Sequence, residues 1–164
     1  MPSHIISSES DVRALVRNAA GAKARWVEPG LGSTPGLPDC WVQMKAGGWA
    51  ATVHLELKAG ELEGDEVRFH VRPEQKKQIK SIVDDGGFAG LLVGIKGTCA
   101  CIFLPPTPLT LSGKAKIGGE ESFMVDVREP LAFDRGVFFI FSWGMESVGH
   151  LSSSSGDLAE NGKK

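Results

Sequence analysis

The fold of this chain is decided by Thr52-Val53-His54-Leu55-Glu56-Leu57-Lys58, a stretch in which polar and apolar side chains alternate without a break. Side chains on a β-strand point alternately to its two faces. The apolar residues therefore share one face, and the polar residues His54, Glu56 and Lys58 share the other. We predict a strand with its apolar face in the core and its polar face available for chemistry.

A second strand is predicted just before this one. Residues 39–44 have strand composition, and Gly47-Gly48 lies between the two stretches, as expected for the turn of a hairpin. Antiparallel pairing brings Asp39, at the beginning of the first strand, beside Glu56, near the end of the second. The glycines and prolines of residues 29–38 predict a loop that leads to Asp39.

Two helices flank the hairpin in the sequence. The first is predicted over residues 8–20, with Ser8 as N-cap, an acid in the capping-box position and an apolar stripe along one face. Arg13 and Arg17 fall outside this stripe and are predicted to lie elsewhere on the surface. The second helix is predicted over residues 73–85, with a proline in its first position and two glycines after its end.

Shorter segments complete an α/β order. A short strand is predicted at residues 24–28, and buried strands are predicted at residues 88–95 and 99–104. The acid-rich residues 59–70 predict a solvated, mobile loop. The resulting order of helix, three strands, helix and strand is typical of an α/β fold with helices on a central sheet.

Beyond residue 104 the sequence has a less regular pattern of apolar residues. Residues 1–104 are predicted to form the core domain, and residues 105–151 an elaboration packed on it, with apolar runs at 123–127 and 137–143. Residues 152–164 begin with serines and end in polar residues, which predicts a disordered tail.

Composition sets limits on the class of protein. With 164 residues, 41% hydrophobic and 23% charged, the chain has the balance of one globular domain. A net charge of −2 and a pI near 6.1 count against a strongly basic nucleic-acid binder. A site built from carboxylates lowers the net charge of an enzyme, however, so a local basic strip is compatible with this total.

The cysteines and the lack of long apolar runs bear on the compartment. Cys40, Cys99 and Cys101 are odd in number and lack paired zinc-ligand spacing, so we expect buried thiols in a reducing compartment rather than disulfides or a zinc site. No signal-like or membrane-spanning segment is recognised. We expect a cytoplasmic protein, in the host cytoplasm if it is viral.

The two carboxylates at one edge of the hairpin predict a metal site. Mg²⁺ takes oxygen ligands and keeps several waters, which suits Asp39, Glu56 and the carbonyl of Leu57. Lys58 shares the face of Glu56 and would point its ammonium at a phosphate or at an attacking water. The alternative is that Asp39 is a turn residue and that Glu56 and Lys58 form a solvated face.

These motifs resemble those of the PD-(D/E)xK nuclease superfamily. Pro38-Asp39 followed by Glu56-Leu57-Lys58 matches its signature. Together with Gly36-Leu37 before the first motif and Arg72-Pro73-Glu74-Gln75 after the second, they resemble the virus-type replication-repair nuclease branch. That branch includes small Holliday junction resolvases of phage and bacteria. The resemblance implies a restriction-endonuclease-like α-β-β-β-α-β core and hydrolysis that depends on Mg²⁺, with Mn²⁺ able to substitute.

The resemblance also implies residue roles. Asp39 and Glu56 would bind the metal with the Leu57 carbonyl, and Lys58 would be catalytic. Gln75 would join the catalytic set at the edge of the site. Its helical phase supports this, because Gln75 shares a stripe with the apolar residues that face the sheet, although a polar residue in a first helical turn has the same pattern.

Other residues are weaker candidates. The branch often supplies an acid from its first helix, which makes Glu9 a candidate metal ligand, directly or through water. An acid that stabilises the helix dipole is the alternative for Glu9. His54 is a candidate DNA contact or a plain strand histidine. A basic cluster on or beside the second helix is a candidate DNA-backbone track or a solvated face. Its members are Arg72, Lys76, Lys77 and Lys80.

The function expected from these observations is a structure-specific DNA endonuclease for branched DNA, and in particular a Holliday junction resolvase of phage or mobile-element replication and repair. Paired symmetric nicks would require a homodimer, for which the apolar run 137–143 is a candidate interface, and a buried edge strand explains that run as well. The alternatives are a less selective or flap-type nuclease acting as a monomer, or a DNA-binding module without catalysis.

Overall fold

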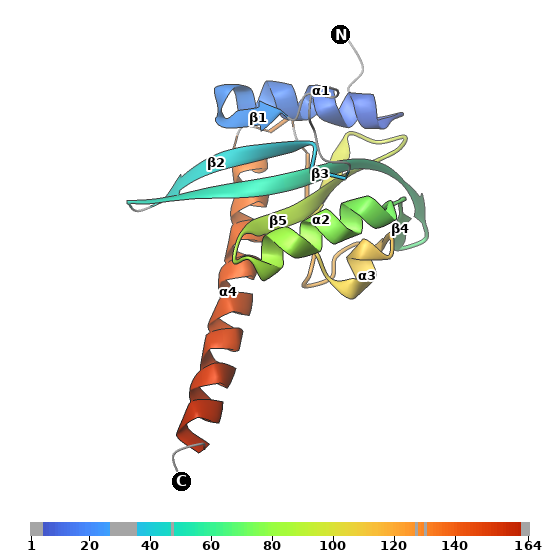
Figure 1. Ribbon diagram of the computed structural model, residues 1–164. Helices are drawn as coiled ribbons and strands as arrows, with labels where there is room; N and C mark the ends of the chain where they lie inside the picture. Colours follow the sequence, from blue (N-terminus) through green and yellow to red (C-terminus); the bar gives the residue numbers. More distant parts are fainter. Residues whose placement is uncertain (1–4, 27–35, 47, 127, 130, 162–164) are drawn as a thin grey trace.

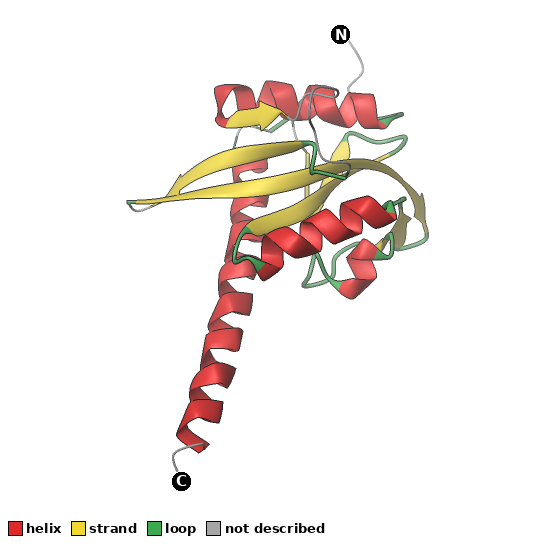
Figure 2. Ribbon diagram, viewed as in Figure 1, coloured by secondary structure: helices red, strands yellow, loops and turns green. Residues whose placement is uncertain are grey.

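A computed structural model describes residues 5–26, 36–46, 48–126, 128–129 and 131–161. A mixed central sheet with helices on both faces makes up the fold (Figures 1 and 2). The strand order across this sheet is β1-β2-β3-β5-β6-β8, in which β3 and β5 are parallel and the other pairs antiparallel. The predicted α/β class is confirmed. The predicted order of helix, three strands, helix and strand holds for the central sheet, and a small strand, β4, is added between β3 and α2.

The helices and strands have the following bounds. The N-terminal elements are α1 (Glu9–Ala20), the short 3₁₀-helix η1 (Gly21–Lys23), β1 (Ala24–Trp26), β2 (Cys40–Ala46) and β3 (Trp49–Glu63). The central elements are β4 (Glu66–Arg68), α2 (Pro73–Asp84), β5 (Phe88–Ile95) and β6 (Ala100–Leu104). The C-terminal elements are α3 (Pro108–Leu111), β7 (Lys114–Lys116), β8 (Phe123–Asp126) and α4 (Ala132–Asn161).

The ends of the first two helices follow local chemistry. At the start of α1, Asp11 Oδ2 accepts a hydrogen bond from the backbone N–H of Ser8 at 3.1 Å, as the capping box predicts. At the start of α2, Pro73 takes the first position, and the side chain of Gln75 accepts from the backbone N–H of Arg72 at 2.9 Å. Both helices therefore begin where the sequence predicts.

One face of the sheet is covered by α1 and α4. The apolar residues of β3 point to this face, where they form a core with Val12 and Val16 of α1 and with Val137 and Ile140 of α4. Gly94 of β5 lies directly under α1, because a Cβ added there would overlap the side chain of Val12. The close approach of helix and sheet depends on the absence of a side chain at this position.

The opposite face is covered by α2, α3 and the small strands β4 and β7. Ile79 of α2 is buried here with Leu91 and Val93 of β5. In the parallel register Glu56 lies beside Leu91, and Lys58 lies beside Val93. The two polar residues of β3 therefore point to the α2 face, away from the apolar residues that alternate with them.

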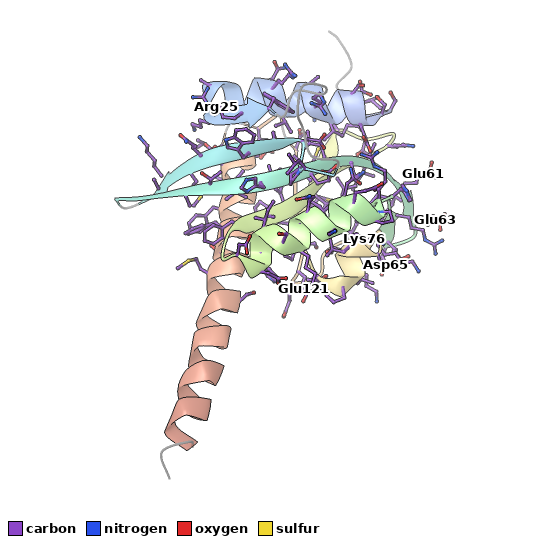
Figure 3. All side chains as sticks on the ribbon, viewed as in Figure 1. Arg25, Glu61, Glu63, Asp65, Lys76 and Glu121 are labelled. Atoms are coloured by element: carbon purple, nitrogen blue, oxygen red, sulfur yellow. The ribbon has the colours of Figure 1, made fainter. Side chains whose placement is uncertain are left out.

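The mobile loop predicted for residues 59–70 is wrong. β3 continues to Glu63, turns at Gly64 and pairs antiparallel with β4. Val67 is fully buried, so this hairpin has an apolar inner side, whereas the acids that suggested a loop point to solvent. Figure 3 shows Glu61, Glu63 and Asp65 on the outside of this hairpin.

The apolar run 137–143 is part of α4 and not an edge strand. Val137 and Ile140 face the core at helical spacing, while Phe138 is 51% exposed. Periodicity over seven residues does not separate a short strand from a helix with one buried stripe, and packing on the sheet decides the outcome. α4 then continues through residues 152–161, away from the sheet (Figure 1). The disorder predicted for residues 152–164 in solution stays a prediction.

Two further predictions concern loops and membranes. Residues 27–28 of the first predicted strand and residues 29–35 of the glycine- and proline-rich loop lie outside the described residues. Among the residues that are described, no helix has both the length and the apolar character needed to cross a membrane.

Candidate active site

Asp39 and Glu56 meet at one edge of the β2–β3 hairpin. Cys40 pairs with Leu55, so Asp39 and Glu56 are the next residues outward on the two strands. Asp39 Oδ2 accepts a hydrogen bond from the backbone N–H of Leu57 at 2.8 Å. The side chain of Asp39 thus extends the ladder by one bond and lies beside Glu56, as the hairpin register predicts.

Glu56 is a buried acid with a raised pKa. Its side chain is buried, Oε1 accepts from Gln75 Nε2 at 2.6 Å, and Oε2 is buried without a hydrogen-bond partner among the residues that the structure describes. Burial raises the pKa of Glu56 to about 9, and the nearby charge of Asp39 acts in the same direction, against the ammonium of Lys58. Glu56 therefore holds a proton at neutral pH unless a cation takes its place.

Lys58 is held among three polar groups. It is only 4% exposed, and Nζ donates to Gln75 Oε1 at 2.9 Å. Nζ also lies 3.7 Å from Glu56 Oε1 and 3.7 Å from Glu9 Oε1. A buried ammonium beside a buried carboxyl is an arrangement that the structure sustains only because each group has a defined partner.

Gln75 connects both of these residues to α2. Its amide nitrogen donates to Glu56, while its oxygen accepts from Lys58 and from the N–H of Arg72. The side chain is 4% exposed. These three bonds fix the amide orientation, so Gln75 positions the acid and the cation relative to each other.

Glu9 approaches the site from the first turn of α1. Its side chain is 59% exposed, and its carboxylate faces Lys58. The same position is favourable for an acid at a helix N-terminus, so both interpretations of Glu9 are compatible with its place in the structure.

Arg13 is a site residue that sequence reasoning missed, because the sequence placed it only on the surface outside the apolar stripe of the first helix. Its Nη2 donates to Asp39 Oδ1 at 2.8 Å. Arg13 follows Glu9 by four residues and so lies on the same side of α1, a spacing that could have indicated its place. Trp26 supports it, because the guanidinium of Arg13 lies 5.1 Å and that of Arg17 4.5 Å from the centre of the indole ring.

The predicted DNA contacts lie on α2, at its N-cap and on β3. Arg72, Lys77 and Lys80 are exposed and Lys76, visible on α2 in Figure 3, is half-buried. They lie along the helix whose first turn carries Gln75, or at its N-cap.

His54 lies on the face of Glu56, with Nδ1 3.2 Å from the carbonyl oxygen of Phe88 and its ring near that of Trp41.

The residues present fit a hard divalent cation. Among the described residues no group of three or more acidic, histidine or cysteine side chains is arranged around a metal position. Two carboxylates and a backbone carbonyl suffice for Mg²⁺ because it keeps several waters. The unpartnered Oε2 of Glu56 beside Asp39 is the kind of buried oxygen that a cation satisfies.

The cysteines take no part in this site. All three are free, and Cys40 and Cys101 are buried. Burial raises the pKa of both buried thiols to about 12, which makes them inert packing residues.

No protein-family model and no curated protein sequence matches the chain. Among solved structures it is similar to the Holliday junction resolvase Hjc of Archaeoglobus fulgidus. The similarity has a TM-score of 0.39 and 18% sequence identity, over 72% of this chain and 84% of the resolvase. Because this TM-score and this identity are low, the similarity carries no functional argument, and the function is argued from the residues of the site.

Proposed function

We propose that this protein is a metal-dependent DNA endonuclease of the PD-(D/E)xK type. The observation that carries the proposal is the buried Oε2 of Glu56, which has no hydrogen-bond partner in the described part of the chain. Glu56 lies beside Asp39 and close to a buried Lys58. A solvated strand face has no reason to bury an acid and an ammonium. Metal-assisted phosphodiester hydrolysis uses both, because it combines a cation site with a positive group near the phosphate.

Each residue of the candidate site would have a part in the reaction. Asp39, Glu56 and the carbonyl of Leu57 would hold Mg²⁺ or Mn²⁺, with Glu9 as a candidate further ligand. The bound ion supplies a water of lowered pKa and offsets negative charge on the phosphate. Lys58 directs its ammonium at the phosphate or the attacking water. Gln75 keeps Lys58 and Glu56 in place through its two side-chain hydrogen bonds.

The substrate we propose is branched DNA, in particular the four-way junction of phage or mobile-element replication and repair. The support is the resemblance of the site motifs to the virus-type replication-repair branch, and the basic residues along the helix that begins at the site. Residues 1–104 would form the nuclease core, and residues 105–151 would pack on it. The latter residues include β8, which adds a strand to the sheet, and part of α4.

Paired cuts in a junction would require a homodimer. Val137 and Ile140 are buried in the protomer, so they do not contribute to an interface. Phe138 and Leu131 are exposed beside Phe123 and Phe139, and this smaller apolar surface is the candidate contact with a second copy.

The test is a cleavage panel of a four-way junction, a flap, a single strand and a linear duplex, each with Mg²⁺, Mn²⁺ or EDTA. Asp39→Ala and Lys58→Ala should abolish cleavage of the junction. Glu61→Gln is the matched control, because it neutralises an exposed acid on the same strand away from the site. The junction should receive two symmetric nicks.

The alternatives predict different results. Equal cutting of linear duplex and junction, or cuts that are not paired, would favour the less selective or flap-type nuclease. Binding of DNA without any cleavage in Mg²⁺ or Mn²⁺ would favour a silent binding module. Cleavage that survives both Asp39→Ala and Lys58→Ala would place the site elsewhere.

A further inference from the structure

Both oxygens of Asp39 are engaged before any cation binds. Oδ2 accepts from the N–H of Leu57, and Oδ1 accepts from Arg13. The two bonds differ in their consequences for a cation. A neutral N–H leaves the carboxylate charge and further lone pairs available, whereas the guanidinium places a positive charge where a metal ion would experience repulsion.

The contact between Arg13 and Asp39 is also exchangeable. The side chain of Arg13 is 37% exposed and that of Asp39 is 22% exposed, so a guanidinium that leaves the carboxylate has access to water. The bonds of Glu56 and Lys58 to Gln75 are buried and have no such exit. Of the two cationic side chains of the site, Arg13 and Lys58, Arg13 is thus the one with access to solvent.

Trp26 limits where Arg13 can go. The guanidinium groups of both Arg13 and Arg17 lie over the indole ring, and cation–π attraction favours their staying there. A guanidinium that is released from Asp39 but kept on this ring remains beside the two carboxylates. A planar fork of N–H donors at that place matches the oxygens of a phosphate.

We propose that Arg13 exchanges partners during the reaction cycle. It neutralises Asp39 while the carboxylate pair is empty, gives up Asp39 when a divalent cation binds, and then binds a non-bridging oxygen of the substrate phosphate. Cation binding and DNA binding are coupled through this one side chain. The inference rests on the proposed function and adds Arg13 to the residues that touch the substrate.

The first measurement is cation affinity without DNA, by calorimetry with Mn²⁺. Arg13→Gln removes the competing charge and should bind Mn²⁺ about tenfold more tightly than the unaltered protein. Arg17→Gln is the matched control, because Arg17 contacts the same ring but makes no contact with Asp39. It should leave the Mn²⁺ affinity within about twofold.

The second measurement is junction affinity in Ca²⁺ and in EDTA, with the DNA checked for integrity after each titration. Arg13→Gln should weaken junction binding about tenfold at saturating Ca²⁺. The slope of the logarithm of affinity against the logarithm of salt concentration should fall by about one, as expected for the loss of one phosphate contact. In EDTA it should bind like the unaltered protein, because Arg13 is then engaged by Asp39. Arg17→Gln should have the same effect in both conditions.

Three results would overturn the exchange. Weaker Mn²⁺ binding by Arg13→Gln would make Arg13 an orienting partner of Asp39. Equal weakening of DNA binding with and without Ca²⁺ would make it a permanent phosphate contact. Unchanged Mn²⁺ and DNA affinities would leave it with neither role. Arg13→Lys, which keeps the charge and loses the fork, should keep the wild-type Mn²⁺ affinity, and tighter binding would contradict the charge argument.

These results are distinct from failure of the proposed function. If the unaltered protein binds no divalent cation and cuts no DNA, the nuclease assignment itself is wrong. If it binds and cuts while Arg13→Gln matches it in both titrations, the exchange alone is wrong. Circular dichroism and thermal melting of each variant establish that the fold is intact.

Discussion

Lys58 Nζ lies 2.9 Å from Oε1 of Gln75, and this bond joins β3 to α2 inside the protein. The amide of the same glutamine reaches Glu56 at 2.6 Å. Because all three side chains are buried, loss of the amide leaves an ammonium and a carboxyl without those hydrogen bonds. Gln75 acts through its two neighbours and is a positioning residue.

Gln75→Ala should lower the single-turnover rate about 10–100-fold and leave the DNA dissociation constant nearly unchanged. It should also lower the free energy of unfolding by about 1–3 kcal/mol, measured by urea denaturation. Gln78→Ala, on the same helix and half-buried, is the control and should keep the wild-type rate. A weaker DNA affinity with an unchanged rate would contradict the positioning role.

Glu56 should make stability depend on pH. Its pKa is raised from 4.5 to about 9 in the folded protein. Between these values the folded state holds a proton that the unfolded state releases. The contribution of this proton to the free energy of unfolding is fully present below about pH 4.5. It is lost as pH rises toward about 9, by at most about 1.4 kcal/mol per pH unit.

Glu56→Gln tests this directly. The variant carries no titrating group at the position, so its advantage over the unaltered protein should grow from pH 5 to pH 9 in metal-free buffer. Urea unfolding at a series of pH values measures the difference. Parallel curves for the two proteins over this range would show that Glu56 titrates near its ordinary value.

Cation binding should release a proton from Glu56. The group is protonated at neutral pH and must be ionised to ligate a metal, so affinity for Mn²⁺ should rise from about pH 6 to about pH 9. Calorimetry at pH 7 in two buffers of different ionisation enthalpy should give different apparent enthalpies. Equal enthalpies in the two buffers would mean that no proton leaves the site.

Gly36→Ala should damage the site more than its size suggests. Gly36 has φ +87°, and a Cβ there would overlap the backbone carbonyl of Glu74 in the first turn of α2. The segment leading to Asp39 would have to move. We expect a loss of stability of about 1–3 kcal/mol and a large loss of cleavage.

Gly48→Ala is the matched control for that change. Gly48 has φ +86°, yet among the described residues, its chain neighbours aside, no atom lies within 4 Å of the added Cβ. It should cost about 1 kcal/mol from backbone strain and leave the cleavage rate intact. If both variants cut DNA at the same rate, the contact of Gly36 with α2 does not hold the site.

Local patterns were sufficient for much of the fold. The alternation in residues 52–58, the capping signals before α1 and the proline that begins α2 depend on neighbouring residues, and the structure agrees with each. The meeting of Asp39 and Glu56 also followed from the sequence, because hairpin register converts chain spacing into position.

Other features were not predictable in this way. The acids of residues 61–66 outnumber the apolar residues by which the β3–β4 hairpin packs on the core. The composition of this segment therefore indicated a loop. Residues 137–143 form part of a helix because α4 packs on the sheet at Gly90 and Gly136, where a side chain would not fit. Neither outcome is encoded in local periodicity.

The chain by itself determined which residue types stand at the edge of the hairpin, and hence the chemistry available there. Only the tertiary structure decided how they are used. It brought α2 over β3 so that Gln75 isolates Glu56 and Lys58 from water, and it brought α1 to the edge so that Arg13 reaches Asp39. Burial and ion pairing of this kind join residues 17–26 positions apart, and their energies depend on distance and solvent exclusion, which no local pattern records.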